Sequence, residues 1–243
     1  SLAFLANRLS AHPDIRNARF LPYTPMPTLA LTVAGVEVHL TVDNYDAVYV
    51  ARLVREYCAV HPKVGVFLHF CRRLHEHLGV IAPKSGTLPP YAATLLNLNF
   101  LVDTGLLPNL QSPSFIAHAL KAGGDVHDYP RLVDAQPVRF ARAGGPATAP
   151  FAAQWDALQL ADLFPRFFTT CAKAGFHPAA LLLPPNTSFR NPTPFTVISP
   201  FVPLENVAER CVLRPNDVYV FPFTQIRKML ERDVAPRSPV VAI

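Results

Sequence analysis

The chain has 243 residues, of which 50% are hydrophobic and only 16% are charged. This composition excludes a disordered protein and predicts one large hydrophobic core or two smaller ones. Lysine and arginine outnumber aspartate and glutamate by 22 to 17, and the resulting net charge of +5 suits polyanions without identifying a nucleic-acid-binding protein by itself.

The cysteines and the apolar runs exclude further classes. The four cysteines stand far apart, with no CxxC pair, so a zinc ribbon and a disulfide framework are not expected and a reducing compartment is favoured. The apolar runs, such as AATLLNLNFLV, are shorter than the roughly 20 residues of a membrane-spanning helix. We therefore expect no membrane partner.

The first 43 residues predict a short helix followed by strands. Leu2, Leu5 and Leu9 are spaced as on one side of a helix, which AHPD ends. The segments ARFLPY, TLALTV and VEVHLTV alternate or run apolar with β-branched residues, and the AGV that joins the last two is typical of a hairpin. Residues 17–43 are therefore predicted to be the last strands of a small sheet.

From Tyr45 the periodicity becomes helical. In AVYVARLVREYC the apolar residues recur at helical spacing, with Arg52, Arg55 and Glu56 off that stripe. A second helix is expected after His61, because Pro62 suits a first helical turn, and it is expected to end at Gly79. A third begins in GTLPPY and is apolar nearly all round, as in the centre of a bundle.

The remainder is predicted to be a connection followed by more helices. Residues 112–153 are rich in alanine, glycine and proline, which is typical of an irregular insertion. The segment WDALQLADLFPRFFTTCAKAGF is helical in pattern, PFTVISPFVPLENVAERCV is a strand or loop, and DVYVFPFTQIRKMLERDV is a closing helix.

These segments resemble, in order, the poly(A) polymerase and terminal uridylyltransferase branch of the nucleotidyltransferase family, especially its mitochondrial members in kinetoplastids. GTLPPYAATLLNLNFL followed by LLPNLQ is similar to the family's GTLSSYA…FLQ…LPNLQ. TLALTVAGVEVHLTVDN is similar to its strand pair VPIVKL…GIEVDISVNN. HPKVGVFLHFCRRLHEHLGV, LQLADLFPRFFTTCAKAGF and ISPFVPLENVA also resemble family segments, so the resemblance runs through about residues 17–212.

The resemblance implies an α+β fold. We expect a remnant of the nucleotidyltransferase palm sheet at residues 1–45. A mainly helical, poly(A)-polymerase-like central domain, the PAP-associated domain, is expected at residues 46–243, with the irregular insertion at about 112–153.

The resemblance also implies a lost catalytic centre. The family transfers a nucleotide to an RNA 3′ hydroxyl with two metal ions held by three carboxylates, the third of them in GIEVDI. Here the segment reads GVEVHL, so His39 stands at the aspartate position, and a neutral imidazole is a poor magnesium ligand. The first two carboxylates and the family's Gly-Ser pair are not in this chain. We expect no catalytic residue and no bound metal.

The nucleotide-binding motif is altered as well. Pro89 and Pro90 replace the SS of the family's SSY, and they offer neither a hydroxyl nor an N–H. Tyr91 remains and can stack on a base, and Arg72 aligns with the family's phosphate-binding lysine. The candidates for nucleotide or RNA binding are Tyr91, Arg72, Arg73 and Lys84.

Three functions remain open. The first is a pseudoenzyme, without cofactor, that binds RNA and protein subunits in a mitochondrial RNA-processing or ribosome-assembly complex of the matrix. The second is an active RNA terminal uridylyl- or adenylyltransferase that uses Mg²⁺ and nucleoside triphosphate, with its first carboxylates upstream of Ser1. The third is a regulatory subunit that binds a nucleotide through Tyr91 and Arg72 without turnover.

Each candidate also has a purely structural interpretation. His39 fits an edge-strand histidine opposite the face of Val36 and Val38, and Tyr91 fits a buried aromatic residue. The basic residues of the first two long helices fit solvated faces; these are Arg52, Arg55, Lys63, Arg72 and Arg73. The histidines of the second of these helices are spaced by six and two residues, which does not predict a metal site; they are His69, His75 and His77.

Overall fold

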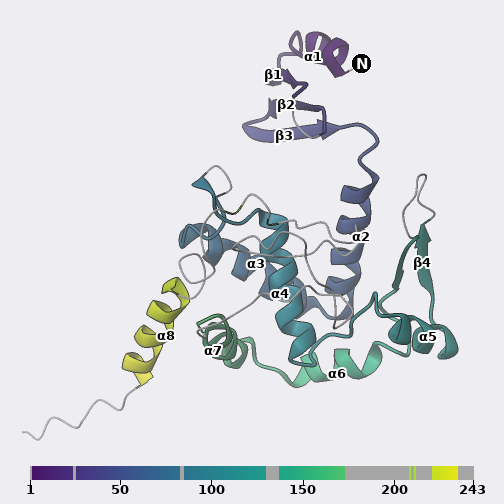
Figure 1. The fold of residues 1–243 in the computed structure, drawn as a ribbon, viewed down its shortest axis with the longest axis vertical. Coiled ribbons are helices and arrows are strands. Elements are labelled where there is room, and N and C mark those ends of the chain that lie inside the picture. Colours follow the sequence, from purple (N-terminus) through teal and green to yellow (C-terminus); the bar gives the residue numbers. More distant parts are fainter. Residues whose placement is uncertain are drawn as a thin grey trace, which may run out of the picture. The chain divides into compact units, whose positions relative to one another are not determined.

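The computed structural model describes residues 2–23, 26–82, 85–129, 137–172, 208, 211 and 221–234. The chain divides into two compact units, Ser1–Arg52 and Leu53–Ile243, and Figure 1 shows their elements in chain order. The first unit contains a small sheet and the second is mainly helical. This mixed architecture confirms the predicted α+β class.

The first unit is a helix on a three-stranded antiparallel sheet. Helix α1 spans Leu2–Leu9, and the strands β1, β2 and β3 span Ile15–Leu21, Thr28–Val33 and Val36–Thr41 in the order β1-β2-β3. The predicted hairpin is confirmed. Its two-residue turn has φ of 48° at Ala34 and 83° at Gly35, the left-handed pair that matches the twist of hairpin strands.

The strand register separates apolar from polar side chains. Residues directly opposite one another point to the same face, and β2 pairs with β3 through Leu31↔Val38 and Ala30↔His39. The face that contains Leu31 and Val38 packs against α1 and forms the core of the unit. The face that contains His39 is consequently the one that α1 does not cover.

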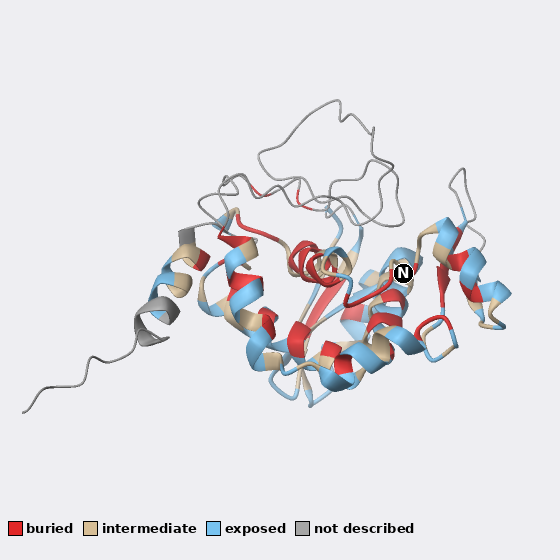
Figure 2. Ribbon diagram, turned by 90° about the horizontal axis from the view of Figure 1, so that it is seen from below, coloured by how far each residue is buried: buried red, intermediate tan, exposed pale blue. Residues whose placement is uncertain are grey.

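The second unit is built around α4. Helix α2 spans Tyr45–Val60 and begins within the first unit, and α3 spans Pro62–His77. Helix α4, Pro90–Asp103, packs beside α3, and its buried residues lie all round the helix, so the predicted central position is confirmed. Buried residues, red in Figure 2, lie on the sides of the helices that face one another.

Aromatic rings fill the space between these helices. Phe67 of α3, Phe100 of α4 and Phe167 of α7, which spans Leu160–Cys171, lie with ring centroids 5.1 to 6.1 Å apart. Helix α8, Phe221–Val234, adds Phe223, whose centroid lies 5.6 Å from that of Phe167. Such offset and edge-to-face contacts stabilise a core beyond the area that they bury.

Residues 112–153 are more regular than the sequence predicts. They contain helix α5, Pro113–Lys121, and a hairpin of β4, Val126–Tyr129, and β5, Val138–Ala141. The start of helix α6, Ala149–Ala157, also falls in this range. Each strand has four residues, which is too short for alternation to stand out beside the glycines and prolines.

Beyond residue 153, the structure divides one predicted helix in two and confirms another. The expected helical pattern from Trp155 forms two helices, α6 and α7, with Leu158 in extended conformation between them. The closing helix is confirmed as α8. The strand or loop expected at 194–212 lies outside the described residues except at 208 and 211. None of the described helices is both long and apolar enough to cross a bilayer.

Candidate functional site

His39 lies on the exposed polar face of β3. Its Nε2 donates to Oε1 of Glu37 at 3.1 Å, and both side chains are exposed. The register confirms the predicted placement of His39 on the face opposite Val36 and Val38. The imidazole is thus held by its neighbour on the same strand.

The rest of this face carries positive charge. Across the sheet, His39 lies in one row with Ala30 and Arg19, and Glu37 lies in one row with Thr32 and Arg16. Two guanidinium groups therefore share the face with a single carboxylate. An ion attracted to this surface would be an anion rather than a cation.

This face does not fit a two-magnesium centre. Magnesium takes hard, anionic oxygen ligands, and the catalytic pair needs several carboxylates together. The face offers one carboxylate, already hydrogen-bonded to an imidazole. Across the described ranges, no three His, Cys, Asp or Glu side chains form a group that could hold a metal ion.

The two prolines of GTLPPY begin helix α4. Pro89 is the N-cap residue, with φ −62° and ψ 146°, and Pro90 is the first helical residue. The carbonyl of Pro89 accepts the N–H of Ala93 at 3.1 Å, and none of the described side chains caps this end of the helix. The first N–H groups of a helix have no intrahelical partner, so proline costs little there. The motif thus has a structural role here, and neither proline offers a hydroxyl or an N–H donor.

The predicted binding residues lie on two adjacent helices. Tyr91 is the second residue of α4 and is half-buried. Arg72 and Arg73 are exposed on α3 and converge on one carboxylate, with Arg72 Nε 3.0 Å and Arg73 Nη1 3.4 Å from the oxygens of Glu76. Lys84 lies outside the described residues. A binding role for these residues stays a prediction.

Lys63 has a structural role that the sequence did not suggest. Its Nζ donates to the carbonyls of Trp155 and Leu158, both at 2.8 Å, and to that of Asp156 at 3.2 Å. These carbonyls lie at the C-terminal end of helix α6 and at the residue that follows it, where the helix dipole is negative. The expectation that Lys63 is merely solvated is therefore wrong. The sequence shows no sign of these contacts, because the partners lie more than ninety residues away.

The segment LLPNLQ also has a structural role. Asn109 Oδ1 accepts the N–H groups of Gln111 and Ser112, each at 3.1 Å, and so forms the turn after α4. The carbonyl of Leu106 accepts the indole N–H of Trp155 at 2.8 Å. These hydrogen bonds give the segment a role in stabilising the fold.

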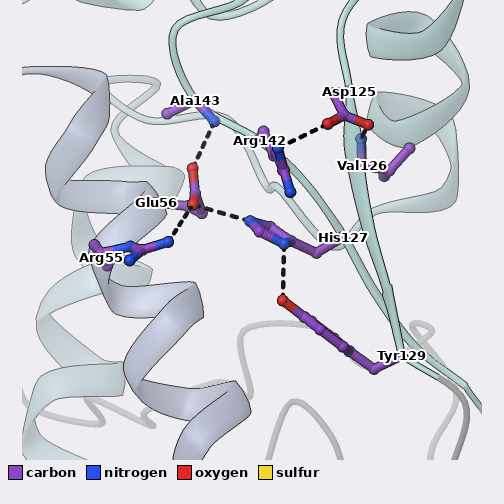
Figure 3. Close-up of polar contacts among 8 residues, drawn as sticks. All are labelled: Arg55, Glu56, Asp125, Val126, His127, Tyr129, Arg142 and Ala143. Atoms are coloured by element: carbon purple, nitrogen blue, oxygen red, sulfur yellow. Dashed lines mark hydrogen bonds and ion pairs between the residues drawn. The ribbon is translucent and has the colours of Figure 1, made fainter.

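A buried polar network joins α2 to the β4–β5 hairpin (Figure 3). His127 Nε2 donates to Glu56 Oε1 at 2.9 Å, and the N–H of Ala143 donates to Oε2 at 3.0 Å. The hydroxyl of Tyr129 lies 2.8 Å from His127 Nδ1. Arg55 Nη2 approaches the same carboxylate from the surface at 3.6 Å.

The electrostatics of the network keep Glu56 charged. Burial by itself raises the pKa of this carboxyl, but the hydrogen bonds from His127 and Ala143 and the nearby positive charges outweigh it and lower the pKa below its ordinary value. The expectation that Glu56 lies off the buried side of its helix is wrong. No local signal could reveal this, because His127 is 71 residues away. The network anchors the hairpin.

The fold matches solved structures of mtPAP, a mitochondrial poly(A) polymerase. The complex with CTP has a TM-score of 0.72 and 15% identity over 95% of this chain. The complexes with GTP and UTP each have a TM-score of 0.66, at 15% and 14% identity over 93% and 94% of the chain. The match covers 47% to 49% of the mtPAP chain, so this chain spans about half its length.

No family model and no curated protein matches the sequence. The likeness in structure nevertheless establishes a nucleotidyltransferase-like fold of the poly(A) polymerase kind. This part of the family prediction is confirmed. The kinetoplastid type and the loss of catalysis stay predictions.

Proposed function

We propose that the protein is a non-catalytic, nucleotidyltransferase-like subunit that binds RNA or proteins in a mitochondrial RNA-processing or ribosome-assembly complex. The observation that carries this proposal is the polar face of the β1–β3 sheet. There Arg16, Arg19 and His39 share the surface with a single carboxylate, Glu37. The metal-ion mechanism of the family needs the opposite charge at such a surface.

The start of α4 supports the same proposal. A phosphate is held by hydroxyl and N–H donors, and Pro89 and Pro90 provide neither at the two positions where the resemblance expects serines. The two changes lie in different units of the chain. A loss of metal ligands and a loss of phosphate donors together weigh more heavily against turnover than either one alone.

The proposed partners follow from charge and from fold. The net charge of +5 favours a polyanion, and the similar structures of mtPAP hold nucleotides. Membership of a complex, the mitochondrial matrix and a kinetoplastid source rest on the family resemblance. A protein that keeps such a fold without its chemistry acts through binding.

An extension assay tests the proposal. The purified protein is incubated with labelled single-stranded RNA, magnesium or manganese, and each nucleoside triphosphate in turn, beside a His39→Asp variant. We expect no extension by either protein, because the variant still carries Arg16 and Arg19 on the same face. Extension by the unaltered protein would instead support the active terminal uridylyl- or adenylyltransferase.

A gel-shift titration with the same RNA separates the two kinds of partner. A shift that weakens with salt is expected for a surface that contacts phosphates. A protein that neither extends nor shifts RNA would favour protein subunits as the partners.

A further inference from the structure

We propose that one side of helix α3, together with Phe164 of α7, is a stacking surface for single-stranded RNA. The surface, called the α3 stripe below, consists of Val66, Phe70, Arg73 and His77. The inference rests on the proposed RNA-binding function and assigns that function a site, which shares only Arg73 with the binding candidates named from the sequence.

The α3 stripe is one continuous row along the helix. Its members follow the spacing i, i+4, i+7 and i+11, which places them above one another on one side. At a rise of 1.5 Å per residue the row is about 16 Å long. Every member is exposed, and two of them are apolar, Val66 at 56% and Phe70 at 42% relative exposure.

The aromatic part of the surface is held from below. The ring of Phe70 lies on that of Phe164, with centroids 4.2 Å apart and planes at 44°. Phe164 in turn stacks on the buried Phe67, at 5.8 Å and 20°. Phe70 therefore rests on rings that belong to the core. An exposed aromatic ring on a rigid support is what an unpaired base can stack on.

The polar part of the surface is cationic. The side chain of Arg73 is 72% exposed, and a single contact to Glu76 at 3.4 Å leaves most of its guanidinium directed to solvent. Glu76 is the acidic residue of α3, and two exposed arginines, Arg72 and Arg73, share it, so positive charge exceeds negative charge there. Arginine can bind a phosphate with two parallel hydrogen bonds. Charge complementarity thus favours RNA, which is a polyanion, over an apolar protein partner with few acidic residues.

Arg72 lies on another side of the helix. Consecutive residues are separated by roughly 100° around the axis, so Arg72 points away from the row that contains Arg73 and Phe70, with Glu76 between the two arginines. The α3 stripe and the Arg72 candidate can therefore be tested separately.

Fluorescence anisotropy with labelled 12-nucleotide single-stranded RNA tests the assignment on the full 243-residue chain. Phe70→Leu keeps an apolar side chain and removes the stacking ring, and we expect about tenfold weaker binding. Arg73→Gln removes one phosphate contact, and we expect the slope of log Kd against log salt concentration to fall by about 0.7. Arg73 is exposed, so this variant also serves if Phe70→Leu disturbs packing.

One matched control and one comparison accompany these variants. Arg166→Gln removes an exposed arginine from α7, about 160° around that helix from Phe164, and Arg72→Gln removes the arginine on the other side of α3. Arg166→Gln should leave RNA binding unchanged, whereas Arg72→Gln measures any separate contribution of the Arg72 candidate. Circular dichroism checks that each variant retains its helices.

The outcomes separate this inference from the proposed function. Weaker binding by both α3-stripe variants, with Arg166→Gln unchanged, supports the assignment. RNA binding that neither α3-stripe variant alters, or that all four variants weaken equally, overturns the assignment and leaves RNA binding itself intact. Absence of RNA binding by the unaltered protein overturns both.

Discussion

The sheet of the first unit and the helical core of the second differ in how their sequence motifs are used. In the sheet, the motif residue His39 is exposed, and its Nε2 contacts Glu37 on the same strand. In the helical unit, the motif residues of GTLPPY and LPNLQ start a helix and form a turn. The fold is thus maintained by buried contacts, while the positions that would carry chemistry are at the surface.

The difference has an energetic reason. A substitution at an exposed position away from special contacts usually changes stability by less than about 0.5 kcal/mol, whereas truncation of a buried aromatic ring costs about 3–5 kcal/mol. Side chains on the exposed face of the sheet can therefore change while the protein remains folded. The predictions below test this contrast, from the largest expected effect to the smallest.

Phe167→Ala should cause the largest loss. The ring of Phe167 contacts those of Phe67, Phe100 and Phe223 and is fully buried. We expect the free energy of unfolding to fall by about 3–5 kcal/mol, measured by urea titration. Val36→Ala on the sheet, at a side chain with 63% exposure, is the control and should change it by less than about 0.5 kcal/mol. Equal losses would contradict the contrast.

The stability of the helical unit should fall in mild acid. His75 is buried beside Phe167 and Phe223, and burial lowers its pKa to about 4 from 6.5. The unfolded chain then binds the proton more readily, so stability decreases as the pH falls from about 6.5 to 4. The difference between the two pKa values sets an upper limit of about 3 kcal/mol on the loss of stability.

Urea titrations at several pH values check this prediction, with His75→Leu as the comparison. The variant has no group to protonate at that position, so its stability should change less between pH 6.5 and 4. The same pH dependence in both proteins would show that another group is responsible.

Glu56→Gln should have an intermediate effect. The amide has one oxygen and no charge, so it cannot replace both carboxylate oxygens and loses the charge-assisted hydrogen bond with His127, at a cost of about 1–3 kcal/mol. Because the pKa of Glu56 is lowered, its contribution is present above the ordinary value of 4.5 and is lost as the pH falls through the folded value. The stabilities of the two proteins should therefore converge in acid. A constant difference at all pH values would refute the charged network.

Arg72→Gln should have the smallest effect. The ion pair with Glu76 is exposed, and such pairs contribute about 0–1 kcal/mol, so we expect a loss below about 0.5 kcal/mol in urea titrations. Lys63→Met is the matched comparison on the same helix, because its ammonium group binds three carbonyls at the end of α6. A larger loss for Arg72→Gln than for Lys63→Met would reverse the assignment of surface and structural charges.

Local sequence patterns predicted most of the described helices and strands and the face of the sheet on which His39 lies. The hairpin at Ala34 and Gly35, the central position of α4 and the placement of His39 opposite Val36 follow from alternation, periodicity and turn chemistry, and the structure confirms them. These features depend on residues a few positions apart. The likeness to mtPAP confirms the fold that the motifs indicated.

By itself, the sequence determined the α+β class, the elements with strong periodicity and the absence of an aspartate at position 39. Only the tertiary structure decided that Lys63 binds the end of α6, that Glu56 is buried against His127 and that Phe70 rests on Phe164 at the surface. Each of these contacts joins residues more than seventy positions apart, and a pattern read along the chain carries no information about which distant segments meet.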